Sequence, residues 1–418
     1  MSTSSSSSTS SSSGPGGAPP TCDELALTGP PITYDATFEH GWRPSLVPAT
    51  EDGSLVSLAF WQQPPEGPAI PPLRLSNVTF EPWGAWPVGL GPAYDVLSYY
   101  ADSFAVAPAM PSSQPGFATL FYIPTGSFPS DMGLAPAAAP KTHYDPFPTP
   151  IEQWDSFEPG WAVALARGAQ GHLALYEGGG PYTFLGITHV TPNVVETYHG
   201  IACADAPFPA ASIPTKDGFL VAAASGRPFD ACVNDDGIPG PAKEVQVSRL
   251  ALGTGEFTPT TSFEEPDPIA HLVLAKAAEG GWLVWQSNGE SALQPPPIHA
   301  VRLDESGAPS SPIFDVTQDG QSSMPFAAAA LGPLLAVAWV DALDPSSPTL
   351  QLQLFDEKGT FVTGAPHSTA PSWLYDASLS LHPSPDGRHL LLAWADYQSG
   401  GPFAAVTRVA RFSCGGVL

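Results

Sequence analysis

The chain has few basic residues. Lys and Arg number 14 among 418 residues, whereas Asp and Glu number 40, so the formal net charge is −26. A surface this acidic repels a phosphate backbone or an anionic membrane, and we expect no nucleic-acid partner. Divalent cations or cationic partners would be attracted. Acidity also keeps a large protein soluble, and this simpler role explains the charge without any partner.

Long apolar runs are also missing. No run of 18 apolar residues occurs, so we expect no transmembrane segment. The 51 Pro and 40 Gly residues are spread along the whole chain, and both residue types interrupt helices. Short runs of Val, Leu, Phe and Trp between these breakers favour an all-β protein.

Common catalytic and metal motifs are absent from the sequence. There is no G-x-S-x-G nucleophile turn and no Cys-x-x-Cys spacing, so we expect neither triad hydrolysis nor a zinc site on cysteines. Cysteine is scarce as well: the only four are Cys22, Cys203, Cys232 and Cys414. An even number of cysteines in a chain with an export-like start favours disulfides over free thiols.

The start of the chain is of low complexity. Residues 2–13 are only Ser and Thr, and residues 14–20 are Gly, Pro and Ala, so residues 1–20 are predicted to be a disordered tether. The stretch resembles the tether of bacterial lipoproteins, with Met1 standing where the lipidated cysteine would be. No basic start or apolar h-region follows Met1, so an export signal is either absent or removed. We expect a secreted or surface-tethered, extracytoplasmic protein.

A short sequence motif that predicts a strand, called a strand phrase below, recurs at regular intervals. Trp285, Trp339 and Trp394 end three such phrases and stand 54 and 55 residues apart, a period typical of repeat architectures. Each phrase is a glycine or acidic turn followed by an apolar strand. Seven copies can be aligned: 52–60, 102–107, 159–165, 217–223, 280–285, 332–339 and 386–394.

Four strand signals accompany each phrase, most clearly in the fifth copy. Four antiparallel strands repeated seven times predict a seven-bladed β-propeller over residues 21–418. The predicted blades span residues 45–90, 93–135, 150–200, 209–263, 268–318, 322–368 and 372–418. Two packed β-sandwich domains are the alternative, but they do not explain the return of one unit.

The last copy reads Ser384-Pro-Asp-Gly-Arg388 before an apolar strand ending in Trp394. This motif resembles the SPDG repeat of TolB-type, WD40-like propellers. The resemblance implies the propeller fold, with an Asp-Gly hairpin between the first and second strands of a blade. It implies no activity.

The last blade lacks its fourth strand, because the chain ends shortly after the strand at 404–412. The only unassigned strand signal lies at about residues 23–34, so we expect the N-terminal segment to complete this blade. Cys414 would then leave the third strand where Cys22 enters the fourth, which predicts a Cys22–Cys414 disulfide. The remaining pair, Cys203 and Cys232, would hold a local loop near the fourth blade.

Two loops carry possible metal ligands. His189, Glu196 and His199 are imidazole and carboxylate groups that could share an ion, although their spacing matches no established motif. Asp235 and Asp236 resemble the oxygen-rich start of a calcium loop but lack its alternation. Surface or turn roles explain both groups, so calcium is possible and no cofactor is required.

Aromatic and acidic residues offer the remaining candidates. Phe80, Trp83 and Trp86 lie between two copies and could anchor a partner, whereas Trp285, Trp339 and Trp394 are predicted to pack between blades. Near strand ends lie four acids: Asp102, Asp341, Asp376 and Asp396. We therefore expect a monomeric binding scaffold for an unknown protein or glycan partner. The alternative is a hydrolase or lyase acting on a carbohydrate-like substrate with acids in the central funnel.

Overall fold

The computed structural model describes nineteen segments of the chain, all built from strands and turns. They are residues 22–34, 41–62, 74–89, 94–97, 103–108, 117–123, 131–136, 158–179, 183–190, 195–198, 202–204, 209–226, 240–252, 254–289, 295–318, 322–341, 349–365, 379–397 and 405–415. Within these segments there is no helix long and apolar enough to cross a membrane. The expected tether at residues 1–20 lies outside them.

The described strands form seven antiparallel sheets. The first sheet contains β3 (Gly41–Pro48), β4 (Val56–Gln62), β5 (Arg74–Phe80) and β6 (Tyr94–Leu97). The second contains β7 (Ser103–Pro108), β8 (Phe117–Ile123) and β9 (Asp131–Pro136). The third contains β10 (Glu158–Arg167), β11 (His172–Gly179), β12 (Thr183–Val190), β13 (Val195–Tyr198) and β14 (Cys203–Ala204). The fourth contains β15 (Ala210–Pro214), β16 (Gly218–Ser225), β17 (Glu244–Ala251) and β18 (Glu256–Glu264). The fifth contains β19 (Ile269–Lys276), β20 (Gly281–Ser287), β21 (His299–Leu303) and β22 (Phe314–Asp315). The sixth contains β23 (Ser322–Leu331), β24 (Leu334–Asp341), β25 (Thr349–Phe355) and β26 (Phe361–Gly364). The last, called the closing sheet below, contains β27 (Leu379–Pro383), β28 (His389–Tyr397), β29 (Ala405–Cys414), β1 (Leu25–Leu27) and β2 (Ile32–Tyr34).

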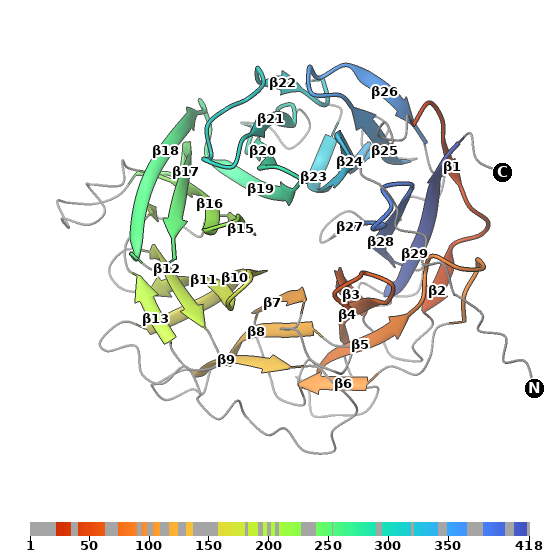
Figure 1. Cartoon of the computed structure of the whole chain (residues 1–418), viewed down its shortest axis with the longest axis horizontal. Coiled ribbons are helices and arrows are strands. Elements are labelled where there is room, and N and C mark those ends of the chain that lie inside the picture. The colour runs from red at the N-terminus through yellow and green to blue at the C-terminus, as the bar shows by residue number, and fades with distance from the viewer. Residues whose placement is uncertain are drawn as a thin grey trace, which may run out of the picture.

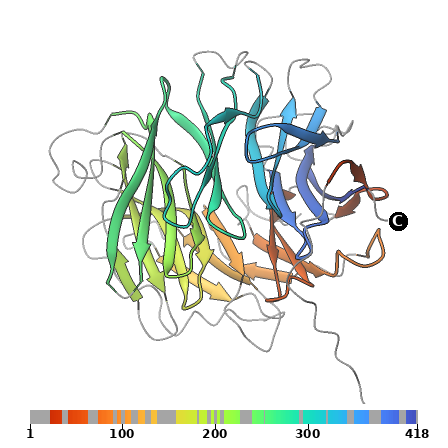
Figure 2. The same cartoon turned by 45° about the horizontal axis from the view of Figure 1, so that its top comes forward.

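The sheets are arranged around a central axis as in a β-propeller (Figures 1 and 2). Their innermost strands contact one another in the order β3, β7, β10, β15, β19, β23, β27 and back to β3. Six sheets have four or five strands, and the sheet β7–β9 has three within the described residues. The prediction of a propeller is therefore confirmed, whereas the prediction of seven complete four-stranded blades is wrong.

The difference arises at β6. Residues 94–97 were predicted to begin the second blade, but they pair with β5 as the fourth strand of the first sheet, with Leu97 opposite Leu75. Residues 81–89 are the described part of the connection between these two strands.

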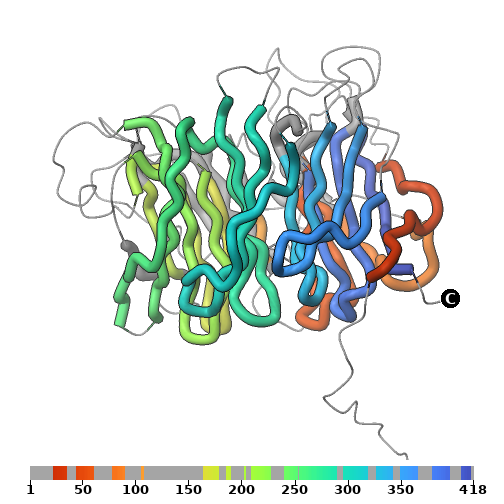
Figure 3. The backbone as a smooth tube through the Cα atoms, turned by 90° about the horizontal axis from the view of Figure 1, so that it is seen from above, coloured from red at the N-terminus to blue at the C-terminus, as the bar shows by residue number. Residues whose placement is uncertain are grey.

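Short hairpins connect the strands at one face, at the lower edge of Figure 3. Glycines with positive φ occupy many of these turns, as at Gly280, Gly307 and Gly359. The Asp304 and Asp356 side chains each accept backbone N–H groups of their own turns, which fixes the hairpin before β22 and the one before β26.

The core lies between neighbouring sheets. All residues of β20 are buried, and Trp285, Trp339 and Trp394 are at most 1% exposed. Trp285 packs with residues of the sheet β15–β18, Trp339 with the sheet β19–β22, and Trp394 with the sheet β23–β26. The recurring tryptophan therefore fills the interface with the preceding sheet, as its repeated position predicted.

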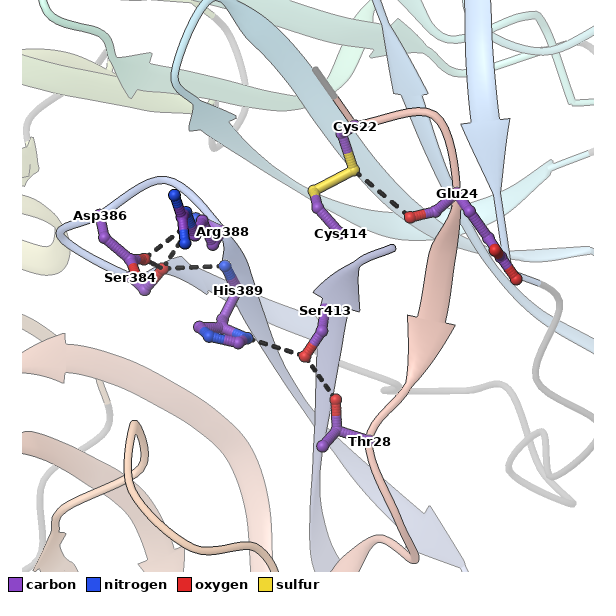
Figure 4. The surroundings of a disulfide bond; sticks show 9 residues. All are labelled: Cys22, Glu24, Thr28, Ser384, Asp386, Arg388, His389, Ser413 and Cys414. Carbon is purple, nitrogen blue, oxygen red and sulfur yellow. Dashed lines mark hydrogen bonds between the residues drawn. A yellow bond between two sulfur atoms is a disulfide. The ribbon is translucent and has the colours of Figure 1, made fainter. Parts of the chain in front are cut away.

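The closing sheet joins the two ends of the described chain. Strands β1 and β2 both pair with β29, with Leu25 opposite Cys414 and Ile32 opposite Val409. A disulfide links Cys22 to Cys414, whose Cα atoms lie 4.9 Å apart (Figure 4). The predicted closing strand and its disulfide are confirmed. Cys203 is also disulfide-bonded, but Cys232 lies outside the described residues, so their pairing stays a prediction.

Candidate functional site

The predicted metal ligands are only partly within the described chain. The β12–β13 ladder places His189 opposite Glu196, so the two residues share one register position on neighbouring strands. His189 is buried, and its ring meets Phe219 of the next sheet edge-on at 5.9 Å. His199, Asp235 and Asp236 lie outside the described residues. No group of three potential ligands occurs in the segments that the structure describes, and metal binding here stays a prediction.

The aromatic cluster predicted as a binding surface lies at the junction of the first sheet and the closing sheet. Phe80 is 5% exposed and packs in the core that these two sheets share. The half-buried Trp83 and Trp86 indoles donate hydrogen bonds to the backbone oxygens of Gly53 and Pro30, at 2.7 and 3.0 Å. These contacts hold the loop at residues 81–89 against the ring junction.

Basic groups from the closing sheet complete this junction. The buried Arg411 guanidinium donates to the backbone oxygens of Pro82 and Gly84 and lies 5.2 Å from the centre of the Trp86 ring. Trp83 stacks on His382 and His389 at 6.3 and 6.2 Å. Burial lowers the pKa of His382 to about 4, so this imidazole is neutral at pH 7. These contacts give the cluster a structural role, and partner binding by Phe80, Trp83 and Trp86 stays a prediction.

Two of the four acids expected in the central funnel lie within the described chain. Asp341 and Asp396 lie near the ends of β24 and β28, which are second strands of their sheets. Asp102 and Asp376 lie outside the described residues. Of the seven innermost strands only β10 contains an acidic residue, Glu158.

A groove not predicted from the sequence lies on the rim of the ring, between the sheet β19–β22 and the sheet β23–β26. We call it the rim groove; its volume is about 790 Å³, within the usual range of small-ligand sites. Its apolar lining consists of Pro297, Val316, Phe355 and Phe361. Its polar lining consists of Asp315, Thr317, Gln318 and Gln353, and Gly359 completes it.

The one ionisable side chain in this lining, Asp315, is held in place by a hydrogen-bonded chain. Its Oδ1 lies 2.8 Å from Nδ1 of His299, the residue opposite on β21, while its carboxylate remains 64% exposed. Nε2 of His299 lies 3.7 Å from Glu265, which accepts the indole N–H of Trp285 at 2.7 Å. A buried tryptophan thus orients Glu265, and His299 links this carboxylate to the groove.

An aromatic series forms the apolar side of the groove. Phe314 lies 5.9 Å from Phe355, which lies 6.3 Å from Phe361. A Cβ at Gly359 would come within 2.3 Å of Phe314, so only glycine allows this turn to approach the neighbouring sheet. Phe361 is 55% exposed at the end of the series. The rim groove can therefore bind a ligand with an apolar part and a cationic or hydrogen-bonding part.

The register of β21 and β22 explains why the sequence did not indicate this site. Both strands were predicted, but Leu303 bridges Pro309 next to the turn, whereas His299 pairs with Asp315. Continuing the pairing from the turn would place His299 opposite Ile313. The segment from Pro309 to Asp315 is two residues longer than the segment of β21 that it pairs with. These two additional residues shift the register and place Asp315 opposite His299.

No protein-family model matches the chain, and no curated relative was found. The fold is similar to that of a protein of unknown function from Dyadobacter fermentans, with a TM-score of 0.50, 11% identity, and 93% of this chain and 99% of that chain covered. It is also similar to an oligogalacturonate lyase in complex with manganese, with a TM-score of 0.50, 13% identity, and 92% and 96% covered. The class of protein is a β-propeller, and at these identities the likeness shows the fold alone.

Proposed function

We propose that the protein is an extracytoplasmic binding scaffold, tethered through residues 1–20, that presents a propeller to a protein or glycan partner. The observation that carries this proposal is the disulfide between Cys22 and Cys414. Disulfides form and persist in oxidising compartments, and this one joins the first and last described strands of the ring. The Ser/Gly/Pro-rich composition before Cys22 supports the tether.

The proposal includes finer features of the scaffold. The sheet β7–β9, which has three strands within the described residues, counts as one of seven blades, because its inner strand lies between β3 and β10 in the ring of contacts. The hairpin at 384–388 supports kinship with TolB-type, WD40-like repeats, since Ser384 and Asp386 accept the N–H of Arg388 as a turn motif requires. The scaffold acts as a monomer and needs no cofactor.

The alternative, a propeller hydrolase or lyase acting on a carbohydrate-like substrate, requires two carboxylates about 5–10 Å apart around the reacting bond. Six of the innermost strands, β3, β7, β15, β19, β23 and β27, contain neither Asp nor Glu. Asp102 and Asp376 lie outside the described residues, so this chemistry stays the alternative.

Compartment is tested in the source cells with the full-length protein. A membrane-impermeant protease and a maleimide reagent are applied to intact cells, and thiols are counted before and after reduction. We expect protease access on intact cells and four alkylated thiols only after reduction. A protein that is protected from the protease and carries free thiols in the native state would rule out the extracytoplasmic scaffold.

A further inference from the structure

We propose that the rim groove binds an extended segment of a partner protein that carries an arginine or lysine, with the basic group at Asp315 and apolar atoms on Phe361. This proposal deepens the proposed function and rests on it. It identifies the surface of the scaffold that contacts a partner and the chemistry of the contacting segment.

The charge of the groove supports a cationic occupant. Asp315 is its one ionisable lining residue, is 64% exposed, and belongs to a protein of net charge −26. The hydrogen bond to His299 fixes the direction of the carboxylate before any ligand arrives, so little side-chain entropy is lost on binding. Glu265 behind His299 adds a second negative group on the same side.

Besides His299, β21 carries one other basic residue, Arg302, and this residue is engaged elsewhere. Arg302 lies over the Trp282 ring at 5.4 Å, and its guanidinium is 3.9 Å from Glu357. Its side chain is only 12% exposed, so the charge is directed into the sheet interface. Asp315 consequently keeps an exposed negative charge that a partner's cation can pair with.

The apolar lining supports a side chain with a long stem. The exposed Phe361 offers ring surface, and Pro297 and the largely buried Val316 and Phe355 complete the apolar lining. Arginine and lysine combine a hydrocarbon stem with a charged end, and an exposed phenylalanine ring can also contact the cation itself. Ile313, 49% exposed and two residues before Asp315, extends the apolar surface for neighbouring residues of the segment.

The outer edge of β22 supports an extended conformation. β22 is the outermost strand of its sheet, and the backbone N–H of Val316 already bonds to Ile298. Hydrogen-bonded and non-hydrogen-bonded pairs alternate in an antiparallel ladder, so the backbone N–H and C=O of Asp315 turn away from β21. Gln353 provides an amide group in the lining beside that edge. An extended segment can therefore form main-chain hydrogen bonds next to its ion pair.

The test uses the full-length protein and three acetylated, amidated octapeptides that differ only at the central residue, which is Arg, Gln or Glu within an otherwise Pro, Leu and Ser sequence. Affinities are measured by calorimetry at 0.05 and 0.5 M NaCl. We expect the Arg peptide to bind roughly tenfold more tightly than the Gln peptide at low salt, with a smaller preference at high salt. The Glu peptide should bind most weakly.

Matched variants locate the interaction. Asp315→Asn should abolish the preference for Arg over Gln, and Phe361→Ser should weaken all three peptides. Glu256→Gln removes the same charge from an exposed site on β18 and should leave the preference unchanged. An Asp315→Asn variant that keeps the full preference would overturn the proposal.

A photo-crosslinking arm separates the possible occupants. The Arg peptide with a benzophenone group should label residues 313–318 and 353–361. Three results would overturn the proposal by assigning the groove differently. They are labelling elsewhere, crosslinks from residues 1–20 of the same chain into the groove, and glycan binding that Asp315→Asn leaves unchanged. In these cases the proposed scaffold still stands, because only the thiol and protease results on intact cells decide it.

Discussion

In the sheet β23–β26 a peptide turn joins the third strand to the fourth, whereas in the closing sheet the same position holds two chain ends and a disulfide. The turn at Asp356 is fixed by local hydrogen bonds, with Oδ1 accepting the N–H groups of Lys358 and Thr360, both at 2.8 Å. At the closing sheet, Gly415 donates its N–H to Glu24 at 2.5 Å beside the Cys22–Cys414 bond.

The difference lies in the distance along the chain that each connection spans. A hairpin forms from residues that are already neighbours, whereas the disulfide joins residues 392 positions apart. Closing a long loop removes much more conformational entropy from the unfolded chain than closing a short one. The closing sheet therefore depends on one covalent bond where the other sheets depend on local turn chemistry.

The largest effect is expected from breaking the disulfide. Replacing Cys22 and Cys414 by Ser should lower the free energy of unfolding by about 4–6 kcal/mol on the chain-entropy model. Chemical denaturation followed by tryptophan fluorescence measures this. Each single variant should lose as much stability as the double variant, because one bond is lost in every case. Unchanged stability would show that β1 is held by its ladder alone.

A smaller loss is expected from distorting the hairpin of the sheet β23–β26. Gly359→Ala adds a Cβ within 2.3 Å of Phe314 at a residue with φ of +77°, and should cost about 2–4 kcal/mol. Gly332→Ala is the matched control, because Gly332 also has positive φ but no atom lies within 4 Å of its Cβ position. This control should cost about 1–2 kcal/mol. Equal losses would show that contact with the neighbouring sheet does not matter.

Acid should weaken the closing sheet through His382. Its pKa is lowered to about 4 by burial, so between pH 6.5 and 4 the unfolded chain takes up a proton that the folded chain does not. Stability contributed by the neutral imidazole is present above pH 6.5 and falls as the pH is lowered through this window. His382→Gln should reduce the slope of stability against pH there, and NMR should place the His382 titration near pH 4. A titration near 6.5 would contradict this prediction.

The smallest effect is expected from the hydrogen bonds that tie β1 to its neighbours. Ser413 Oγ lies 2.5 Å from Thr28 Oγ1 and 2.7 Å from Nδ1 of His389 (Figure 4). Ser413→Ala should cost about 1 kcal/mol, because both partners lose this contact. Thr33→Val on β2 is the control, since its contact with Arg408 is long, at 3.4 Å, and exposed, and should change stability by less than about 0.5 kcal/mol. Hydrogen exchange of the β1 amides measures both.

The propeller and its closure could be predicted from the sequence because local signals determine them. Turn residues, apolar phrases and the spacing of Trp285, Trp339 and Trp394 mark the strands and their order. Counting strands left one missing beside Cys414, and that gap predicted the partner of Cys22. These features depend on neighbours in the chain or on topology.

Other features could not be predicted because they depend on contacts between distant segments. The strand at 94–97 pairs with β5, and the loop that follows β5 packs against Arg411, more than 300 residues away in the chain. The rim groove required the register shift that places Asp315 opposite His299. Neither a partner across a sheet interface nor an irregular register leaves a local sequence signal.

The bond between Cys22 and Cys414 also has a mechanical consequence. A pull applied between residues before Cys22 and residues after Cys414 passes through two side chains whose Cα atoms are 4.9 Å apart, and the sheets between them carry no load. After reduction the same pull would act along the β1–β29 ladder and peel strands from the ring. The disulfide thus makes the described propeller inextensible between Cys22 and Cys414.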